Sequence, residues 1–217
     1  MANLPDPVTL IPFLFALALV PIAAVMVTSY TKLVVVFALL RNALGLQQVP
    51  PPMVTNGLAL VLTWFVMYPV AQDAMKVLDP ATGMPPKNLS VMEVLGTVKE
   101  PLREFLQQHA REKERDFFVE AAQRSMKPAV ASTVKRTDFV VLVPAFTISE
   151  LTEAFLIGFL LFLPFVVIDL IVANVLLALG MQMMSPAMVA LPLKLLLFVM
   201  LDGWSRLAHA LVLSYSP

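Results

Sequence analysis

The chain has 217 residues, of which 59% are hydrophobic and 14% are charged, with 15 basic and 15 acidic side chains. This length suits one compact unit, and the apolar content excludes fibrous and disordered proteins. Because the charges balance, there is no basic field to attract nucleic acid, and we expect no nucleic-acid partner. Without cysteine, the chain can form neither a disulfide framework nor a thiolate metal site.

One stretch decides the class of protein, because between residues 154 and 201 the only ionisable side chains are Asp169 and Lys194. Apolar runs of about 20 residues match the hydrocarbon thickness of a bilayer when they are helical. We therefore predict an all-α integral membrane protein of long, kinked helical hairpins with a small polar insert. Prolines and polar residues interrupt the apolar runs, and such breaks must be shielded from lipid by protein. This favours an oligomer, such as a ring or helical assembly, or partner subunits.

Residues 1–72 are predicted to form an N-terminal hydrophobic helical hairpin. Residues 8–31 carry no charge and are followed by Lys32 and Arg41, so one long helix or a broken pair fits the pattern. A second helix is expected over residues 55–71, after a proline tract that no helix can contain. Since no cationic residue precedes Lys32, we expect the first apolar run to be retained rather than removed as a secretory signal.

Residues 73–138 are predicted to form a polar helical insert, because they hold 21 of the 30 charged side chains. Glu100 followed by Pro101 predicts a helix start, since proline is favoured at the first helical position. Lys32 and Arg41 favour a cytoplasmic first turn, which would leave the insert in the periplasm.

Residues 139–217 are predicted to form a C-terminal hydrophobic hairpin. Thr147 and Glu150 fit a capping box, so a helix is expected to begin near residue 148. Glu150 and Glu153 are then interpreted as first-turn acids that the helix dipole favours.

Four helix breaks are expected in this half, at Pro164, Gly180, Pro186 and Pro192. Pro164 should kink the first helix, and Gly180 should end it. The next helix is expected to begin around Pro192 and to run past Trp204.

Catalytic chemistry has no support in the sequence, which lacks H-E-x-x-H, G-x-S-x-G and phosphate-loop motifs. We expect no catalytic residue, no metal and no cofactor. Asp169 and Asp202 could be imagined as an aspartyl pair, but each has a nearer cation, Lys194 and Arg206 respectively. Buried pairs that fix helix register are the simpler interpretation, with a conduit or proton relay as the alternative. The residues expected at buried polar or inter-subunit positions are Lys32, Arg41, Glu150, Glu153, Asp169, Lys194, Asp202 and Arg206.

Met181, Met183 and Met184 form the densest methionine cluster, and Gln182 interrupts it. Their position at a hairpin tip separates them from the other methionines. Core packing is one interpretation, because methionine fills irregular gaps. The other is a compliant plug, since unbranched thioethers can deform and reseal around a passing object.

Several long segments carry a family resemblance: TSYTKLVVVFALLRNALG, GLALVLTWFVMYPV, EPLREFL, LVPAFTISELTEAF, GFLLFLPFVVIDLIVANVLLALGM and LPLKLLLFVMLDGW. In this order they closely resemble the FliP/SctR family, the export-gate subunits of flagellar and virulence-associated type III secretion. The segment MQMMSP and the W-S-R after Gly203 look more similar to the injectisome branch than to the flagellar one.

The resemblance implies a non-enzymatic pore subunit of the bacterial inner membrane. About five copies would assemble with FliQ/SctS-like and FliR/SctT-like subunits, largely on the periplasmic side, and unfolded secreted proteins would pass through the centre. Met181, Met183 and Met184 would act as a gasket. A small-solute secondary transporter with Asp169 and Lys194 as coupling residues remains an alternative, although the two apolar halves show no inverted repeat. An intramembrane protease is a third possibility.

Overall fold

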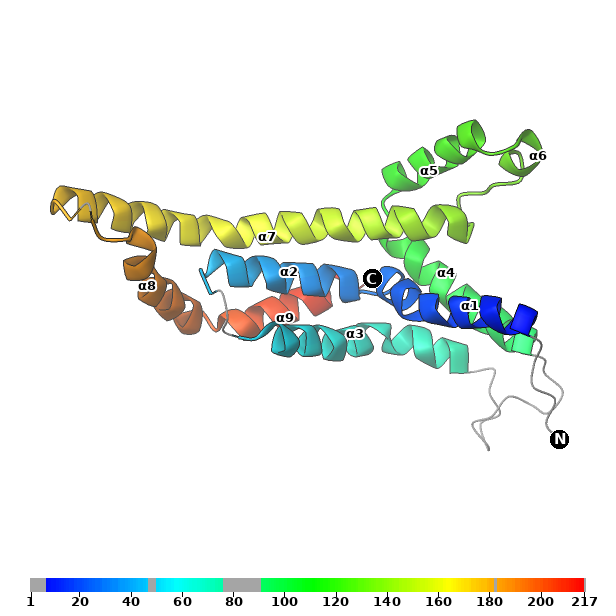
Figure 1. The fold of residues 1–217 in the computed structure, drawn as a ribbon, viewed down its shortest axis with the longest axis horizontal. Coiled ribbons are helices and arrows are strands. Elements are labelled where there is room, and N and C mark those ends of the chain that lie inside the picture. The colour runs from blue at the N-terminus through cyan, green and yellow to red at the C-terminus, as the bar shows by residue number, and fades with distance from the viewer. Residues whose placement is uncertain (1–6, 47–49, 76–90, 182, 217) are drawn as a thin grey trace.

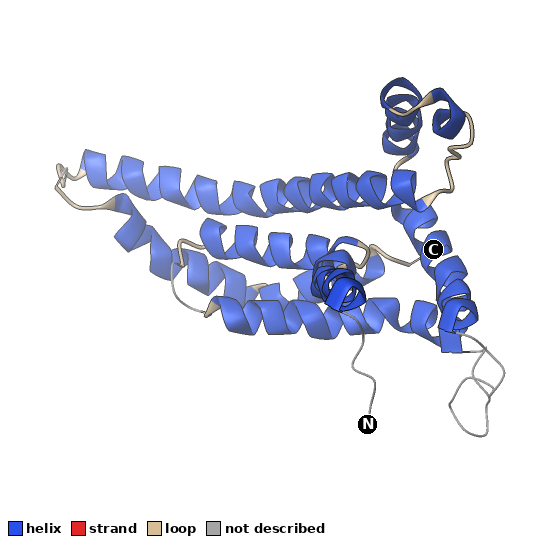
Figure 2. Ribbon diagram, turned by 45° about the vertical axis from the view of Figure 1, so that its right-hand side comes forward, coloured by secondary structure: helices blue, strands red, loops and turns tan. Residues whose placement is uncertain are grey.

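The structure, a computed structural model, describes residues 7–46, 50–75, 91–181 and 183–216. Helices make up almost all of this part of the chain and it contains no strand, which confirms the predicted all-α class (Figure 2). In chain order the helices are α1 (Pro7–Met26), α2 (Tyr30–Ala43), α3 (Pro52–Met75), α4 (Val91–His109), α5 (Glu112–Ser125), α6 (Pro128–Ala131), α7 (Phe139–Ala178), α8 (Pro186–Met200) and α9 (Gly203–Leu213).

The molecule is elongated, and α7 runs along most of its length (Figure 1). Helix α2 packs against α7 on one side and against α3 on the other, so it forms the middle layer. Helix α8 folds back from one end of α7, while α5 and α6 lie at the opposite end. The methionine-rich turn between α7 and α8 is therefore remote from the polar helices.

Helix α2 is the centre of the hydrophobic core. Leu33, Val36, Phe37 and Leu40 are fully buried, and their spacing of three and four residues places them along one helical stripe. Side chains from α3, α7, α8 and α9 pack around them. The contact with α7 is close at Gly158, where an added Cβ atom would collide with the side chain of Leu39. A glycine at this point lets the two helices approach.

Helix α7 contradicts two sequence predictions, since it begins at Phe139 rather than near residue 148 and is not broken at Pro164. The kink expected at Pro164 stays a prediction. Thr147 lies inside the helix, and its hydroxyl donates to the carbonyl of Val143 at 2.8 Å, so it caps nothing. A proline removes only one hydrogen bond of the ladder. The packing of α7 against α2 and α8 keeps the helix continuous despite that loss.

The break between α7 and α8 lies where the glycine and the proline predicted it, but the bounds of α8 differ from the predicted ones. Gly180, with φ of 72°, follows the end of α7, and Pro186 is the first residue of α8. The expected start near Pro192 is wrong, because that proline lies inside α8. The expected run past Trp204 is also wrong, because α8 ends at Met200 and α9 leaves at a 60° bend. Asp202, at φ of 51°, forms the bend.

The N-terminal half forms a broken pair, α1 and α2, and α3 is longer than the predicted 55–71. The expected helix start at Pro101 is wrong, because α4 begins ten residues earlier and contains that proline. Leu106, on the same helix, is fully buried against α7, and this packing favours one continuous α4. The division into 1–72, 73–138 and 139–217 stays a prediction, and residues 76–90 of the insert lie outside the described part.

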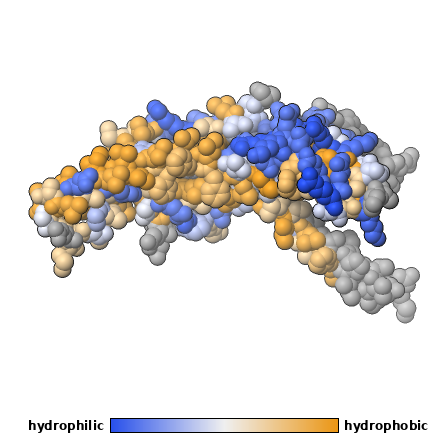
Figure 3. Space-filling view, turned by 90° about the horizontal axis from the view of Figure 1, so that it is seen from above, coloured by the Kyte–Doolittle hydropathy of each residue, from blue (hydrophilic) through white to orange (hydrophobic). Residues whose placement is uncertain are grey.

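Among the described helices, α3 and α7 are long and apolar enough to cross a membrane, and α8 with α9 would make a third, bent span. Only 17% of the most apolar window of α7 is buried inside the chain. Apolar side chains cover much of the visible face, and hydrophilic ones gather at the end where α5 and α6 lie (Figure 3). The fold thus points to a membrane protein with an unusually exposed apolar surface.

Candidate functional site

The methionine-rich turn lies at the far tip of the α7–α8 hairpin (Figure 1). Gly180 ends α7 in the left-handed region, which a glycine adopts without strain. The Met183 side chain is 103% exposed relative to a free residue, and Met181 and Met184 are exposed by 43% and 45%. Gln182, which interrupts the cluster, lies outside the described residues. Met183 therefore has no packing contact with the rest of the chain, whereas Met181 and Met184 are partly covered.

Below the tip, an ion pair ties three helices together. Lys194 of α8 lies 2.6 Å from the carboxylate of Asp169 on α7, as expected from the sequence. The same ammonium donates to the backbone carbonyl of Ala43 at the end of α2, at 3.3 Å. Because Lys194 is buried, both contacts are needed to offset the loss of its hydration.

A second polar cluster lies deeper, around Lys32 of α2. Its side chain is only 1% exposed and its ammonium lies 3.1 Å from Glu150 and 2.8 Å from Glu153, both on α7. Glu150 is fully buried. The hydroxyl of Tyr215, next to the C-terminal end of α9, donates to the other Glu150 oxygen. The Lys32 ammonium also lies 4.1 Å from the centre of the Tyr215 ring.

This Lys32 cluster (Lys32, Glu150, Glu153 and Tyr215) also reaches the polar helices. Arg111, at the junction of α4 and α5, lies 3.5 Å from Glu153. The backbone N–H of Arg111 donates to the hydroxyl of Ser149 at 2.9 Å. The interpretation of Glu150 and Glu153 as first-turn acids is therefore wrong, since both lie well inside α7 and pair with cations from distant segments. Sequence reasoning missed Tyr215, Ser149 and Arg111, because no local pattern marks their contacts.

His109, the last residue of α4, packs against this cluster. Its ring lies 4.7 Å from that of Phe105 and 5.0 Å from that of Tyr215, centre to centre. Burial lowers the pKa of His109 below its ordinary value of 6.5, the positive charge of Lys32 lowers it further, and Glu153 offsets part of this effect.

The other predicted polar residues, Arg41, Asp202 and Arg206, belong to neither cluster. Asp202 and Arg206 are both exposed, and no ion pair joins them in the described structure. The ion pair expected from their i,i+4 spacing does not form, because Asp202 lies at the bend before α9 and not inside a helix. Arg41 is half-buried, and its Nε atom has no hydrogen-bond partner among the described residues. No group of three or more histidine, aspartate and glutamate side chains there could hold a metal ion.

The Lys32 cluster gives a first prediction. Replacing Lys32 with methionine should lower the free energy of unfolding by about 3–5 kcal/mol, because Glu150 would be left buried and unpaired. Thermal and denaturant unfolding in detergent measures this, with Lys99→Met on the exposed side of α4 as the control. Adding Glu150→Gln to Lys32→Met should recover part of the loss. Equal stability of the Lys32 and Lys99 variants would contradict the assignment.

His109 gives a second prediction, concerning pH. The unfolded chain takes up a proton near the ordinary pKa of 6.5, whereas folded His109 does so only at lower pH. Stability should therefore fall as the pH is lowered through 6.5, because the unfolded state binds more protons in that window. Replacing His109 with phenylalanine should reduce this slope in unfolding experiments between about pH 7 and about pH 5. An unchanged slope would show that His109 contributes nothing to it.

Comparison with known proteins places this arrangement in a family. Residues 13–211 match the FliP family. A protein of Xanthomonas campestris pv. glycines described as pathogenicity-related ORF2 is 55% identical, over 92% of each chain. The hypersensitivity response secretion protein HrcR of Ralstonia nicotianae is 53% identical over 95% of this chain and 96% of its own. The Yop proteins translocation protein R of Yersinia pestis is 48% identical over 99% of both. The chain belongs to the FliP family.

Proposed function

We propose that the chain is a core subunit of an injectisome-type type III secretion export gate in the bacterial inner membrane. Sister copies would surround a path for unfolded proteins, and Met181, Met183 and Met184 would seal that path. The observation that carries the proposal is the exposure of these methionines at the tip of a long apolar hairpin. The secretion and translocation named in the relatives' descriptions support the same process for this chain.

The methionine side chains suit a seal for physical reasons. A gate for polypeptides must widen by many ångströms and then close against ions. Methionine has three rotatable side-chain bonds and a polarizable sulfur atom, so a ring of such side chains can pack in many arrangements of similar energy. Because Met183 has no packing partner within its own chain, it is free to contact the same residue of a sister copy.

The sides of the hairpin support assembly. Helix α7 exposes a row of large apolar side chains on the surface away from α2, and most of its apolar window has no cover in the chain. Sister copies or partner subunits would cover it. The exposed residues along this part of α7 include Phe155, Leu156, Phe159, Leu160, Leu163, Val167, Leu170 and Ile171.

The family resemblance suggests the composition of the assembly. We propose about five copies of this chain together with FliQ/SctS-like and FliR/SctT-like subunits, projecting to the periplasmic side. The bend between α8 and α9 and the prolines within α7 are easier to shield in such an assembly than in a lone bundle. In this proposal no side chain performs catalysis.

A small-solute transporter is less well supported. Its coupling residues would be Asp169 and Lys194, which must move or exchange protons during transport. Lys194 is instead fixed by both Asp169 and the Ala43 carbonyl, which joins α2, α7 and α8. This geometry favours a structural role for the pair.

The test is removal of the seal. Replacing Met181, Met183 and Met184 with alanine should raise the ion conductance of membranes that contain the assembled complex, because the shorter side chains cannot meet across the passage. A matched control replaces three exposed methionines away from the tip with alanine: Met53, Met75 and Met200. The control should leave conductance unchanged. An unchanged conductance in the tip variant, with the complex intact, would contradict the seal.

A further inference from the structure

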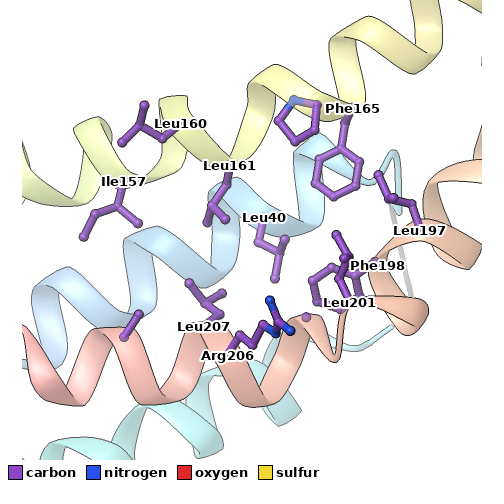
Figure 4. Close-up of a pocket in the computed structure, with 13 residues that line it drawn as sticks. Leu40, Ile157, Leu160, Leu161, Phe165, Leu197, Phe198, Leu201, Arg206 and Leu207 are labelled. Atoms are coloured by element: carbon purple, nitrogen blue, oxygen red, sulfur yellow. The ribbon is translucent and has the colours of Figure 1, made fainter.

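The two sides of α7 have different surroundings. Figure 4 shows Leu161 and Phe165 pointing inward, to a cavity of about 380 Å³ that α2, α8 and α9 complete. On the opposite side Phe155, Phe159 and Leu163 follow one another at every fourth residue, and all three are exposed. Residues spaced by four form a ridge along a helix. We call these three side chains the α7 ridge.

A second apolar face lies on the far side of the molecule. Helix α2 packs between α3 and α7, and α8 lies on the same side of α7 as α3 (Figure 1, Figure 2). Val61, Trp64 and Phe65 of α3 are exposed and point away from α2, because Ala59 on the other side of α3 is buried. Leu196 of α8 is exposed as well. We call Val61, Trp64, Phe65 and Leu196 the α3–α8 face.

A groove lies between the two helices of this face. Its volume is about 450 Å³, and its lining includes Val54 and Leu58 of α3 and Val199 of α8. None of the described residues that line it is charged. Packed helices place the ridge of one into a groove of the other. The groove therefore suits large apolar side chains that project from another helix.

The α7 ridge and the α3–α8 face match in length and in area. Helix α7 has 40 residues, and α8 and α3, which follow one another along the molecule, have 15 and 24. Phe155 and Phe159 are 59% and 61% exposed, and Trp64 and Phe65 are 67% and 65% exposed. Helices α3 and α7 each expose eight or more large apolar side chains. At about 100 Å² for each side chain, either helix offers about 800 Å², the share of one partner in a stable interface.

Polar side chains on both helices favour protein rather than lipid as the cover. Asn174 is exposed on the outer side of α7, four residues after Leu170, and Asn56 is exposed on α3. Lipid tails cannot accept or donate a hydrogen bond to an amide, whereas a neighbouring helix can.

We propose that the α7 ridge of one copy packs on the α3–α8 face of the next copy, with a phenylalanine of the ridge in the groove. The proposal rests on the proposed function, because it takes the sister copies to surround one passage. A contact of α7 with α7 joins two copies and then stops. More than two copies around a passage need a contact between two different faces, and this chain has such faces on opposite sides of α2.

The test uses two differently tagged copies in membranes that contain the partner subunits. One copy carries Phe159→Cys and the other carries Val61→Cys, and the natural chain has no cysteine. A short bismaleimide reagent should join the two tags in one product, and neither variant alone should cross-link. A chain with both substitutions should form a ladder of dimers, trimers and larger products, because each joined pair still has a free ridge and a free face.

Two further ridge positions and one control complete the experiment. Phe155→Cys and Leu163→Cys, each combined with Val61→Cys, cover a shift of one helical turn in register. Arg124→Cys, on exposed α5, should give no product with Val61→Cys. Dimers from Phe159→Cys alone would overturn the proposal. So would the absence of a mixed product at all three ridge positions in an intact complex, which is the result expected if lipid or a partner subunit covers the ridge.

A second measurement concerns the strength of the contact. Phe159→Asn and Val61→Asn should each reduce the fraction of the chain in the detergent-extracted complex about tenfold or more, because an amide without a partner is costly at an apolar contact. Both positions are exposed in the single chain, so circular dichroism should show unchanged helix content. Phe117→Asn, at an exposed position of α5, is the matched control and should assemble normally. Normal assembly of the Phe159 and Val61 variants would also overturn the proposal.

Failure of this contact is separable from failure of the gate. The cross-link between ridge and face is detected without any conductance, whereas the methionine seal is tested by conductance. A mixed cross-link together with unchanged conductance of the methionine variants would contradict the seal alone. Raised conductance of those variants without a mixed cross-link would contradict the contact alone.

Discussion

The structure depends on one constraint: the chain has more apolar surface than a single copy can cover. Helix α2 is enclosed by its neighbours, and Leu33, Val36 and Phe37 have no exposure at all. Helices α3 and α7 are the opposite case, because 17% of each apolar window is buried. Exposed apolar patches of this extent mark contact with lipid or with other protein. The fold is therefore best understood as a unit of a larger assembly within or next to a membrane.

Two buried polar clusters hold the helices of one chain together, while its outer apolar surface has no cover within the chain. The Lys32 cluster fixes α2 against α7 and brings the C-terminal Tyr215 and the α4–α5 junction to the same point. The pair of Lys194 and Asp169 fixes the base of the hairpin. Buried ion pairs add little net stability compared with apolar packing, but they penalise any shift in register, since a misplaced charge stays unpaired. The register of the hairpin determines where the methionine-rich turn lies.

Local signals in the sequence predicted some of this and missed the rest for identifiable reasons. Long apolar runs predicted that both hydrophobic halves are helical, and Gly180 with Pro186 marked the turn. The capping-box pattern of Thr147 and Glu150 was misleading, because Glu150 is required by Lys32 on another helix rather than by the amides of its own. Tertiary partners of this kind leave no trace in a window of a few residues. The bend at Asp202 was missed for a similar reason, since the Phe198 ring occupies the space beside Gly203 and only the folded structure shows it.

The central claim is that sister copies bring their methionine-rich turns together around one passage. Because the natural chain has no cysteine, a single Met183→Cys substitution gives an unambiguous probe. In membranes that contain the partner subunits, mild oxidation should cross-link two copies through position 183, while Arg124→Cys on exposed α5 should not cross-link. Cross-linked dimers from position 183 alone are the predicted result. A Met183→Cys protein that stays a 23.8 kDa monomer after oxidation, in an otherwise intact complex, would contradict the account.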